Sequence, residues 1–246
     1  MSGAYGALAP WYDSLTVDIP YEQFADYYEE RFRRHGTEIR TVLDLCCGTG
    51  TLSCILAERG YEMICTDASP DMLAMFREKC AELPEETTQP LLLCQAAEEL
   101  DLYGTVDAVV CSLDGFNYFP PETLPEIFRR LRLFIAPGGL LLFDVHSPER
   151  LRFLDKQCFV DETEELLCLW RSHFDEEIGA LIYGMDIFTD IGDECWAREQ
   201  EEHIEYSHEP EELLRLLTCA GFGEVRMDKN GPHGTEGRIF IEAIRL

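Results

Sequence analysis

The chain has little positive charge. Its 246 residues include 20 Lys or Arg and 48 Asp or Glu, so the formal net charge is −28 at pH 7. A polyanionic surface repels phosphate backbones and gains nothing from counterion release. The densest basic runs, 31–34 and 129–132, fall on expected helices and are interpreted as solvated faces. We therefore expect no nucleic-acid partner.

Long apolar runs and paired cysteine motifs are also missing. No stretch approaches the roughly 20 apolar residues that span a bilayer, and the amino terminus does not resemble a signal peptide. The 11 cysteines are odd in number and include no Cys-x-x-Cys. We expect a reduced, cytoplasmic protein without membrane association. We also expect no metal, because metal-ligand spacing is lacking at His35, His173, His208 and His233.

The segment 41–51, Thr-Val-Leu-Asp-Leu-Cys-Cys-Gly-Thr-Gly-Thr, has the pattern of a short apolar strand, a glycine turn and the start of a helix. Gly48 and Gly50 lack a Cβ, so a ligand can approach the backbone closely. The following helix directs its free N–H groups toward this turn. A second apolar stretch, 61–66, ends at Asp67, and a carboxylate there suits the two hydroxyls of a ribose. The pattern predicts a nucleotide-type cofactor site.

Two residues indicate which cofactor class fits. A dinucleotide fingerprint places a third Gly or Ala where this chain has Ser53, and Asp44 would face a negative diphosphate. A carboxylate at that position better suits a cationic ligand end, such as an ammonium or a sulfonium. An NAD(P)-dependent oxidoreductase stays as the alternative.

Asp44, Gly48 and Gly50 together resemble the first motif of class I S-adenosylmethionine-dependent methyltransferases. Cys46 stands where the first glycine of that motif usually lies. We interpret it as tolerated, since a small thiol can occupy a turn that does not need positive φ. The resemblance extends to small bacterial methyltransferases of unassigned substrate, and covers most of the chain outside 151–207. The further matching segments are 5–6, 11–13, 20–21, 67–73, 106–112, 136–139 and 220–222.

The resemblance implies a cofactor, S-adenosyl-L-methionine, and a set of residues that bind it. One departure from the family is Ala96-Ala97, where many relatives carry an acidic residue that accepts from the adenine amino group. This departure keeps open a second alternative, a non-catalytic protein that only binds S-adenosylmethionine. The predicted cofactor-binding residues are Tyr12, Tyr21, Asp44, Cys46, Gly48, Gly50, Asp67, Ala68, Met72, Ala96, Ala97 and Ser112.

Hydrophobic patterns predict an α/β fold with a parallel sheet covered by helices on both faces. The resemblance makes this a Rossmann-like, doubly wound, seven-stranded methyltransferase sheet. Strands are expected near 41–46, 61–66, 91–94, 106–112 and 139–145, with helices near 50–59, 70–82 and 121–135. The pattern changes within 151–207, where three strand-like runs near 165–173, 180–189 and 196–206 predict a small antiparallel sheet.

We therefore expect one domain in three parts. Residues 1–36 form an amino-terminal cap, 37–150 and 208–246 form the core, and 151–207 form an inserted antiparallel lid over the carboxyl ends of the core strands. The expected function is methyl transfer from S-adenosylmethionine to a nitrogen or oxygen of a small-molecule acceptor. A monomer or a homodimer is expected.

Candidate catalytic residues follow the fourth and fifth expected strands. They are Asp114, Asn117 and His146, and His146 has an ordinary pKa near neutrality. A hydrogen bond from His146 to the backbone of the insert is an equally good interpretation. Methyl transfer requires a general base only where the acceptor must lose a proton early.

Overall fold

The computed structural model describes residues 5–232 and 235–246. Residues 1–4 of the expected cap and lid, and His233, lie outside the described residues. Within those ranges, no helix combines the length and the apolarity that a membrane crossing requires.

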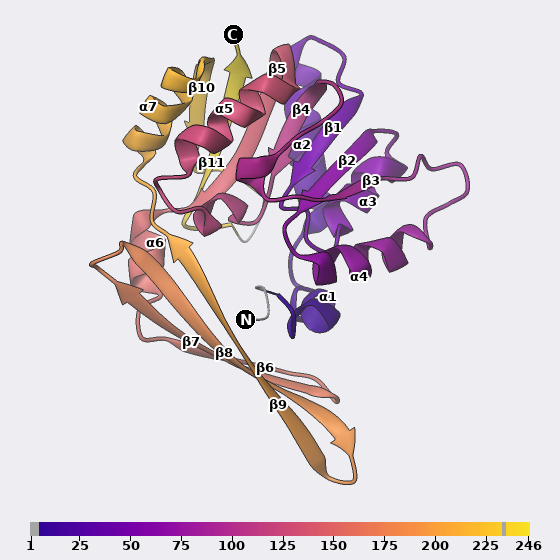
Figure 1. Ribbon diagram of the computed structural model, residues 1–246, viewed down its shortest axis with the longest axis vertical. Helices are drawn as coiled ribbons and strands as arrows, with labels where there is room; N and C mark the ends of the chain where they lie inside the picture. Colours follow the sequence, from indigo (N-terminus) through magenta and orange to yellow (C-terminus); the bar gives the residue numbers. More distant parts are fainter. Residues whose placement is uncertain (1–4, 233–234) are drawn as a thin grey trace.

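Seven strands form the core sheet in the order β10-β11-β5-β4-β1-β2-β3 (Figure 1). Strands β1 to β5 are parallel to one another. Strand β11 runs antiparallel to β5, and β10 runs antiparallel to β11. The order reverses between β1 and β4, and ligands bind at such a switch point beyond the carboxyl ends of the strands. This confirms the predicted fold class. The strands are β1 (Thr41–Leu45), β2 (Glu62–Asp67), β3 (Leu91–Cys94), β4 (Val106–Cys111), β5 (Ile135–His146), β10 (Phe222–Asp228) and β11 (Arg238–Arg245).

Helices cover both faces of this sheet because its strands carry apolar side chains on both sides. One buried cluster joins the sheet to α5 (Leu124–Phe134) and α7 (Pro210–Ala220). The other joins it to α2 (Tyr21–His35), α3 (Thr51–Glu58) and α4 (Pro70–Cys80). The short helices are η1 (Ala9–Trp11), α1 (Tyr12–Leu15), η2 (Ala97–Glu99), η3 (Gly115–Tyr118) and α6 (Pro148–Phe153).

The insert is a separate antiparallel sheet in the order β6-β7-β8-β9, and its far end extends well beyond the core (Figure 1). Its strands are β6 (Cys158–Glu162), β7 (Leu166–Asp175), β8 (Ala180–Gly192) and β9 (Cys195–Tyr206). The sequence predicted three of these four strands. All five residues of β6 are exposed, so no alternation of buried and exposed positions marked this strand.

The amino-terminal segment lies between the core and the insert. Leu8 is buried in a small cluster with side chains of β7 and β8. The Glu201 carboxylate of β9 accepts a hydrogen bond from the Ala7 amide at 2.6 Å. The segment is therefore held on the insert before the chain enters α2.

Candidate functional site

The glycine turn after β1 places three residues in the left-handed backbone region. The φ angles are 60° at Cys46, 55° at Gly48 and 76° at Gly50. Our premise that the Cys46 position does not need positive φ is therefore wrong. A residue with a Cβ pays roughly 1–2 kcal/mol for this conformation, so the thiol is accommodated at a cost.

The two glycines are needed for different reasons. A Cβ built on Gly50 would lie 2.3 Å from the ring of Phe76 in α4, so Gly50 lets α4 pack against the turn. A Cβ built on Gly48 would meet no atom within 4 Å among the described residues. Gly48 therefore keeps open a space beside the backbone, as a ligand cradle requires.

Asp67, at the end of β2, holds this turn in place. Its carboxylate accepts from the Gly48 amide at 2.9 Å and from the Ser69 amide at 2.8 Å. Burial raises the pKa of Asp67 despite these bonds. Each carboxylate oxygen has two lone pairs, so the group keeps acceptor capacity for a ligand.

Asp44, at the end of β1, is buried and hydrogen-bonded to Ser53. The Ser53 hydroxyl donates to its carboxylate at 2.6 Å from the first turns of α3. Burial raises the pKa of Asp44 to about 7. The serine that departs from the dinucleotide pattern thus fixes the orientation of the carboxylate, a role that the sequence did not indicate.

A cavity of about 450 Å³ opens beyond β1, β2 and β4. Every residue predicted to bind the cofactor lines it, from the glycine turn to Ala96, Ala97 and Ser112. Tyr12 and Tyr21 line it from the amino-terminal segment, together with Tyr5, which the sequence analysis did not count among the cofactor-binding residues. No residue of 151–207 contributes to its wall among the described residues.

The amino-terminal segment is fastened to the glycine turn by Asp13. The carboxylate of Asp13 accepts from the Thr49 hydroxyl at 2.6 Å and lies 2.8 Å from the Lys79 ammonium. Thr49 belongs to the glycine turn and Lys79 to α4. The Asp13 side chain therefore holds the amino-terminal segment at the edge of the cavity.

A second cavity of about 390 Å³ lies between the core and the insert. The insert lines it with Trp170, Tyr183, Met185, His203 and Glu205, among others. The two cavities adjoin, because both are lined by Tyr5, Tyr12, Leu113 and Tyr118.

Known proteins share both this fold and much of this sequence. Residues 42–139 match a family model described as a methyltransferase domain. The putative methyltransferase YqeM of Bacillus subtilis is 31% identical over 251 residues, which cover 97% of this chain and 96% of that protein. The chain belongs to the class I S-adenosylmethionine-dependent methyltransferases.

Solved structures show the same fold at low sequence identity. An S-adenosylmethionine-dependent methyltransferase from Clostridium acetobutylicum superimposes with a TM-score of 0.83 at 24% identity, over 99% of both chains. The sugar N-methyltransferase KedS8 from a Streptoalloteichus species gives 0.80 at 20% identity, over 100% of this chain and 94% of its own. The protein is thus an enzyme whose cofactor is S-adenosylmethionine, and the two alternative functions are set aside.

The methyltransferase carries a strained turn where its two cavities meet. Leu113 and Asp114 follow β4 with φ angles of 57° and 59°. The fully buried carboxylate of Asp144 accepts from both of their amides, at 2.9 and 3.1 Å. Arg238 of β11 lies 2.7 Å from Asp144 and 2.5 Å from Asp114. This network fixes the position of Asp114 at the second cavity.

The three predicted catalytic residues divide into two groups. Asp114 and His146 line the second cavity, with His146 Nε2 3.5 Å from Asp114 Oδ1. Burial, together with Arg238, lowers the pKa of His146 to about 3, so the imidazole is neutral.

Asn117 lines neither cavity. Its amide donates to the Tyr206 carbonyl at 2.9 Å, and its oxygen accepts from the His146 amide at 2.8 Å. The expected catalytic role of Asn117 therefore has no support in the structure, because both polar atoms of this fully buried side chain are used to join η3 to β5 and β9.

Proposed function

We propose that the enzyme methylates a nitrogen or oxygen atom of a small-molecule acceptor bound in the second cavity. The observation that carries the proposal is the contact between the cavities, which share four lining residues. An acceptor in the second cavity would therefore lie next to a cofactor in the first. Transfer in line needs close positioning and exclusion of water more than it needs acid catalysis.

The first cavity supplies what S-adenosylmethionine requires. In our proposal Asp67 accepts from the ribose hydroxyls, Asp44 faces the cationic methionine end, and Gly48 leaves space for the ligand. The backbone of Ala96-Ala97 binds the adenine. When bound, the cofactor supplies an activated methyl group and leaves as a neutral thioether. The remaining predicted residues complete the wall of this cavity.

The proposal keeps the expected division of the chain, with 1–36 as cap, 37–150 and 208–246 as core, and 151–207 as lid. Its boundary at 150/151 falls inside α6, so the lid sheet itself begins later, at β6. We propose a cytoplasmic monomer or homodimer, and all eleven cysteines are free thiols.

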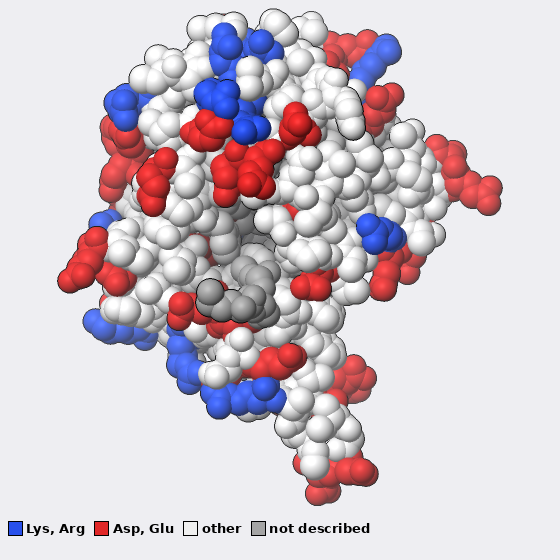
Figure 2. All heavy atoms as spheres, viewed as in Figure 1, with Lys and Arg blue, Asp and Glu red and all other residues white. Residues whose placement is uncertain are grey.

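The charge distribution supports a small acceptor over a nucleic acid. Figure 2 shows acidic side chains across the core and on the protruding end of the insert, with basic ones in smaller groups. The sugar N-methyltransferase KedS8 shares the insert-bearing fold over nearly its whole length, which supports a small acceptor and favours nitrogen over oxygen.

Trp170 offers a test that separates the two cavities. Its ring lines the second cavity and not the first, and its indole N–H is buried without a hydrogen-bond partner among the described residues. Trp170→Ala should lower transfer at least tenfold in a panel of amino sugars, amino acids and alcohols followed by mass spectrometry. Its affinity for S-adenosylhomocysteine should stay within twofold of the wild type.

Trp196→Ala, at a half-exposed position on β9, is the matched control and should change neither quantity. Thermal unfolding should establish that both variants are folded. Methylation of a macromolecule, with no turnover across the small-molecule panel, would overturn the proposal.

A further inference from the structure

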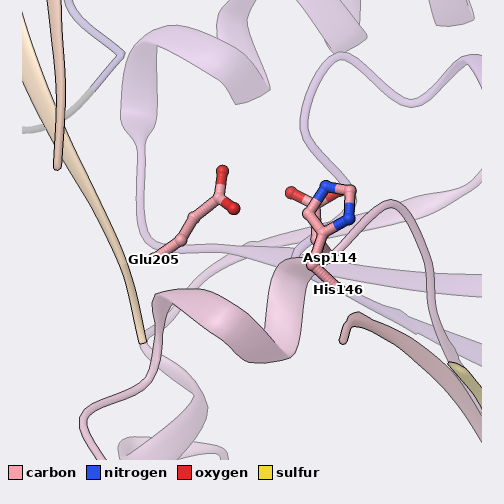
Figure 3. Close-up of side chains that lie close together, drawn as sticks. All are labelled: Asp114, His146 and Glu205. Atoms are coloured by element: carbon pink, nitrogen blue, oxygen red, sulfur yellow. The ribbon is translucent and has the colours of Figure 1, made fainter. Parts of the chain in front are cut away.

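Glu205 is a buried carboxyl group in the wall of the second cavity. It lies near the end of β9, its exposed fraction is 5%, and its Oε2 atom has no hydrogen-bond partner among the described residues. Figure 3 shows Glu205 on one side, with Asp114 and His146 facing it from the other. One ligand atom from each of the three residues lies within 4.8 Å of the others.

The charges around Glu205 do not balance. Asp114 and Asp144 share the single guanidinium of Arg238, at 2.5 and 2.7 Å. His146 is neutral, and although Arg150 also lines the cavity, no cation among the described residues forms a salt bridge with Glu205. An unpaired buried carboxylate costs several kcal/mol, and burial accordingly raises the pKa of Glu205 well above its usual range. Burial therefore favours the protonated form of Glu205 when the cavity contains no cation.

We propose that Glu205 and Asp114 bind an ammonium group, so that the acceptor is an amine which enters as a cation, transfers one N–H proton to the Glu205 carboxylate and then attacks the methyl carbon with the freed electron pair. The inference rests on the proposed function and names its substrate class. A primary ammonium has three N–H donors, and neutral His146 supplies one acceptor nitrogen beside the two carboxylates. Acceptors about 2.8 Å from a tetrahedral nitrogen lie about 4.6 Å apart, and the ligand atoms of this group lie no farther apart than 4.8 Å.

A divalent metal ion fits the same group less well. Arg238 Nη1 already lies 2.5 Å from Asp114 Oδ1, the oxygen that also faces His146. A dication would therefore bind beside a fixed guanidinium. An ammonium adds a single charge, and Glu205 can balance it by releasing its own proton.

Several ionisable groups face Glu205 from the elements packed around it. Each of them can contribute to the pH dependence that a titration of Glu205 measures. Asp114 raises the Glu205 pKa and Arg238 lowers it. The others near Glu205 or in the same cavity are Tyr5, Tyr12, Tyr118, Asp144, His146, Arg150, Tyr183 and His203.

The test uses a matched pair of ligands, cyclohexylammonium and cyclohexanol, which differ in charge but little in shape. Each is titrated calorimetrically into the full chain saturated with S-adenosylhomocysteine, at pH 7. We expect the ammonium to bind at least tenfold more tightly. Titrations in phosphate and in HEPES, neither of which is a primary ammonium, should show release of about one proton per ammonium bound.

Variants locate the effect. Glu205→Gln should lose at least tenfold in ammonium affinity and the proton release, and Glu205→Asp should keep part of both. Glu202→Gln, an exposed glutamate on the same strand, should match the wild type. Equal affinity of the two ligands for the wild type, or an unchanged Glu205→Gln titration, would overturn the inference. Saturable binding of Mg²⁺ or Zn²⁺ that Glu205→Gln abolishes, without ammonium binding, would do the same.

Failure of the inference is distinct from failure of the proposed function. Methylation of small alcohols without ammonium binding would refute the amine alone. Ammonium binding without turnover of any small molecule would refute the proposed function and leave the cation site standing.

Discussion

Removing the carboxylate of Asp13 should loosen the amino-terminal segment from the cofactor cavity. Asp13 accepts hydrogen bonds from the Thr49 hydroxyl at 2.6 Å and the Thr51 hydroxyl at 3.3 Å, and it forms an ion pair with Lys79 at 2.8 Å. The opposite end of the segment is held independently by Glu201 on the Ala7 amide. Asp13→Ala therefore releases the contacts of the segment with the glycine turn and α4, and opening of this part of the segment becomes easier without unfolding the core.

The size of the effect follows mainly from the Thr49 and Lys79 contacts, because the Thr51 bond is long and exposed. A hydrogen bond to a charged group contributes about 1.5–3 kcal/mol, and an exposed ion pair contributes about 0–1 kcal/mol. The Asp13 side chain is 48% exposed, so the lower ends of these ranges apply. A total of about 2 kcal/mol corresponds to a roughly 30-fold change in the opening equilibrium.

Amide hydrogen exchange measures this equilibrium directly. The Trp11 amide, which donates to the Leu8 carbonyl at 2.9 Å, should exchange about 30-fold faster in Asp13→Ala. Amides of β1 should be unchanged. Added S-adenosylmethionine should slow exchange around Tyr12 and Tyr21, because both line the cofactor cavity and we expect the segment to order on binding.

Asp18→Ala removes an exposed carboxylate from the same segment and is the matched control. It should leave Trp11 exchange as in the wild type. Equal exchange rates in Asp13→Ala and the wild type would show that Asp13 does not hold the segment. Equal rates with and without the cofactor would show that the segment is no lid.

Four further outcomes test the cofactor cavity. Gly50→Ala should lower the free energy of unfolding by about 1–3 kcal/mol more than Gly48→Ala, because only the methyl group at position 50 would meet Phe76. Equal urea midpoints of the two variants would contradict this. Gly48→Ala should instead weaken S-adenosylhomocysteine binding. Asp67→Ala should weaken binding of S-adenosylmethionine at least tenfold by calorimetry, and an unchanged affinity would remove Asp67 from the site. The raised pKa of Asp44, about 7, means that the folded state binds this proton more tightly than the unfolded state does. The free energy of unfolding should therefore fall as pH rises from about 4 to about 7, and Asp44→Asn should reduce the slope.

The cofactor cavity could be predicted because its parts are local in sequence. A strand, a glycine turn and a helix need only about twenty consecutive residues, and the next strand ends at Asp67 by the same pattern. The expectation that Cys46 does not need a positive φ was wrong because the identity of a residue does not reveal its backbone angle. Its φ of 60° became visible only in the structure.

The second cavity, which we propose binds the acceptor, could not be predicted in the same way. β9 carries four glutamates within seven residues, at 199, 201, 202 and 205, and nothing in their spacing distinguishes one from another. The register against β8 decides their environments, because Glu205 lies opposite Leu181 and is buried while Glu202 lies opposite Gly184 and is exposed. A functional carboxylate on a polar strand is therefore hidden until the sheet is known.

Arg238 explains how distant segments converge on one site. The antiparallel register of β11 and β5 sets Arg238 opposite His146, at the end of β5. From there its guanidinium reaches Asp144, which holds the strained turn, and Asp114, which faces the acceptor cavity. Because one cation neutralises two buried carboxylates, Glu205 of the insert is left without a salt bridge among the described residues. Arg238 of the antiparallel strand β11 thus holds the turn at Leu113 and Asp114 between the two cavities. In our proposal, Glu205 is then available for a cationic ligand.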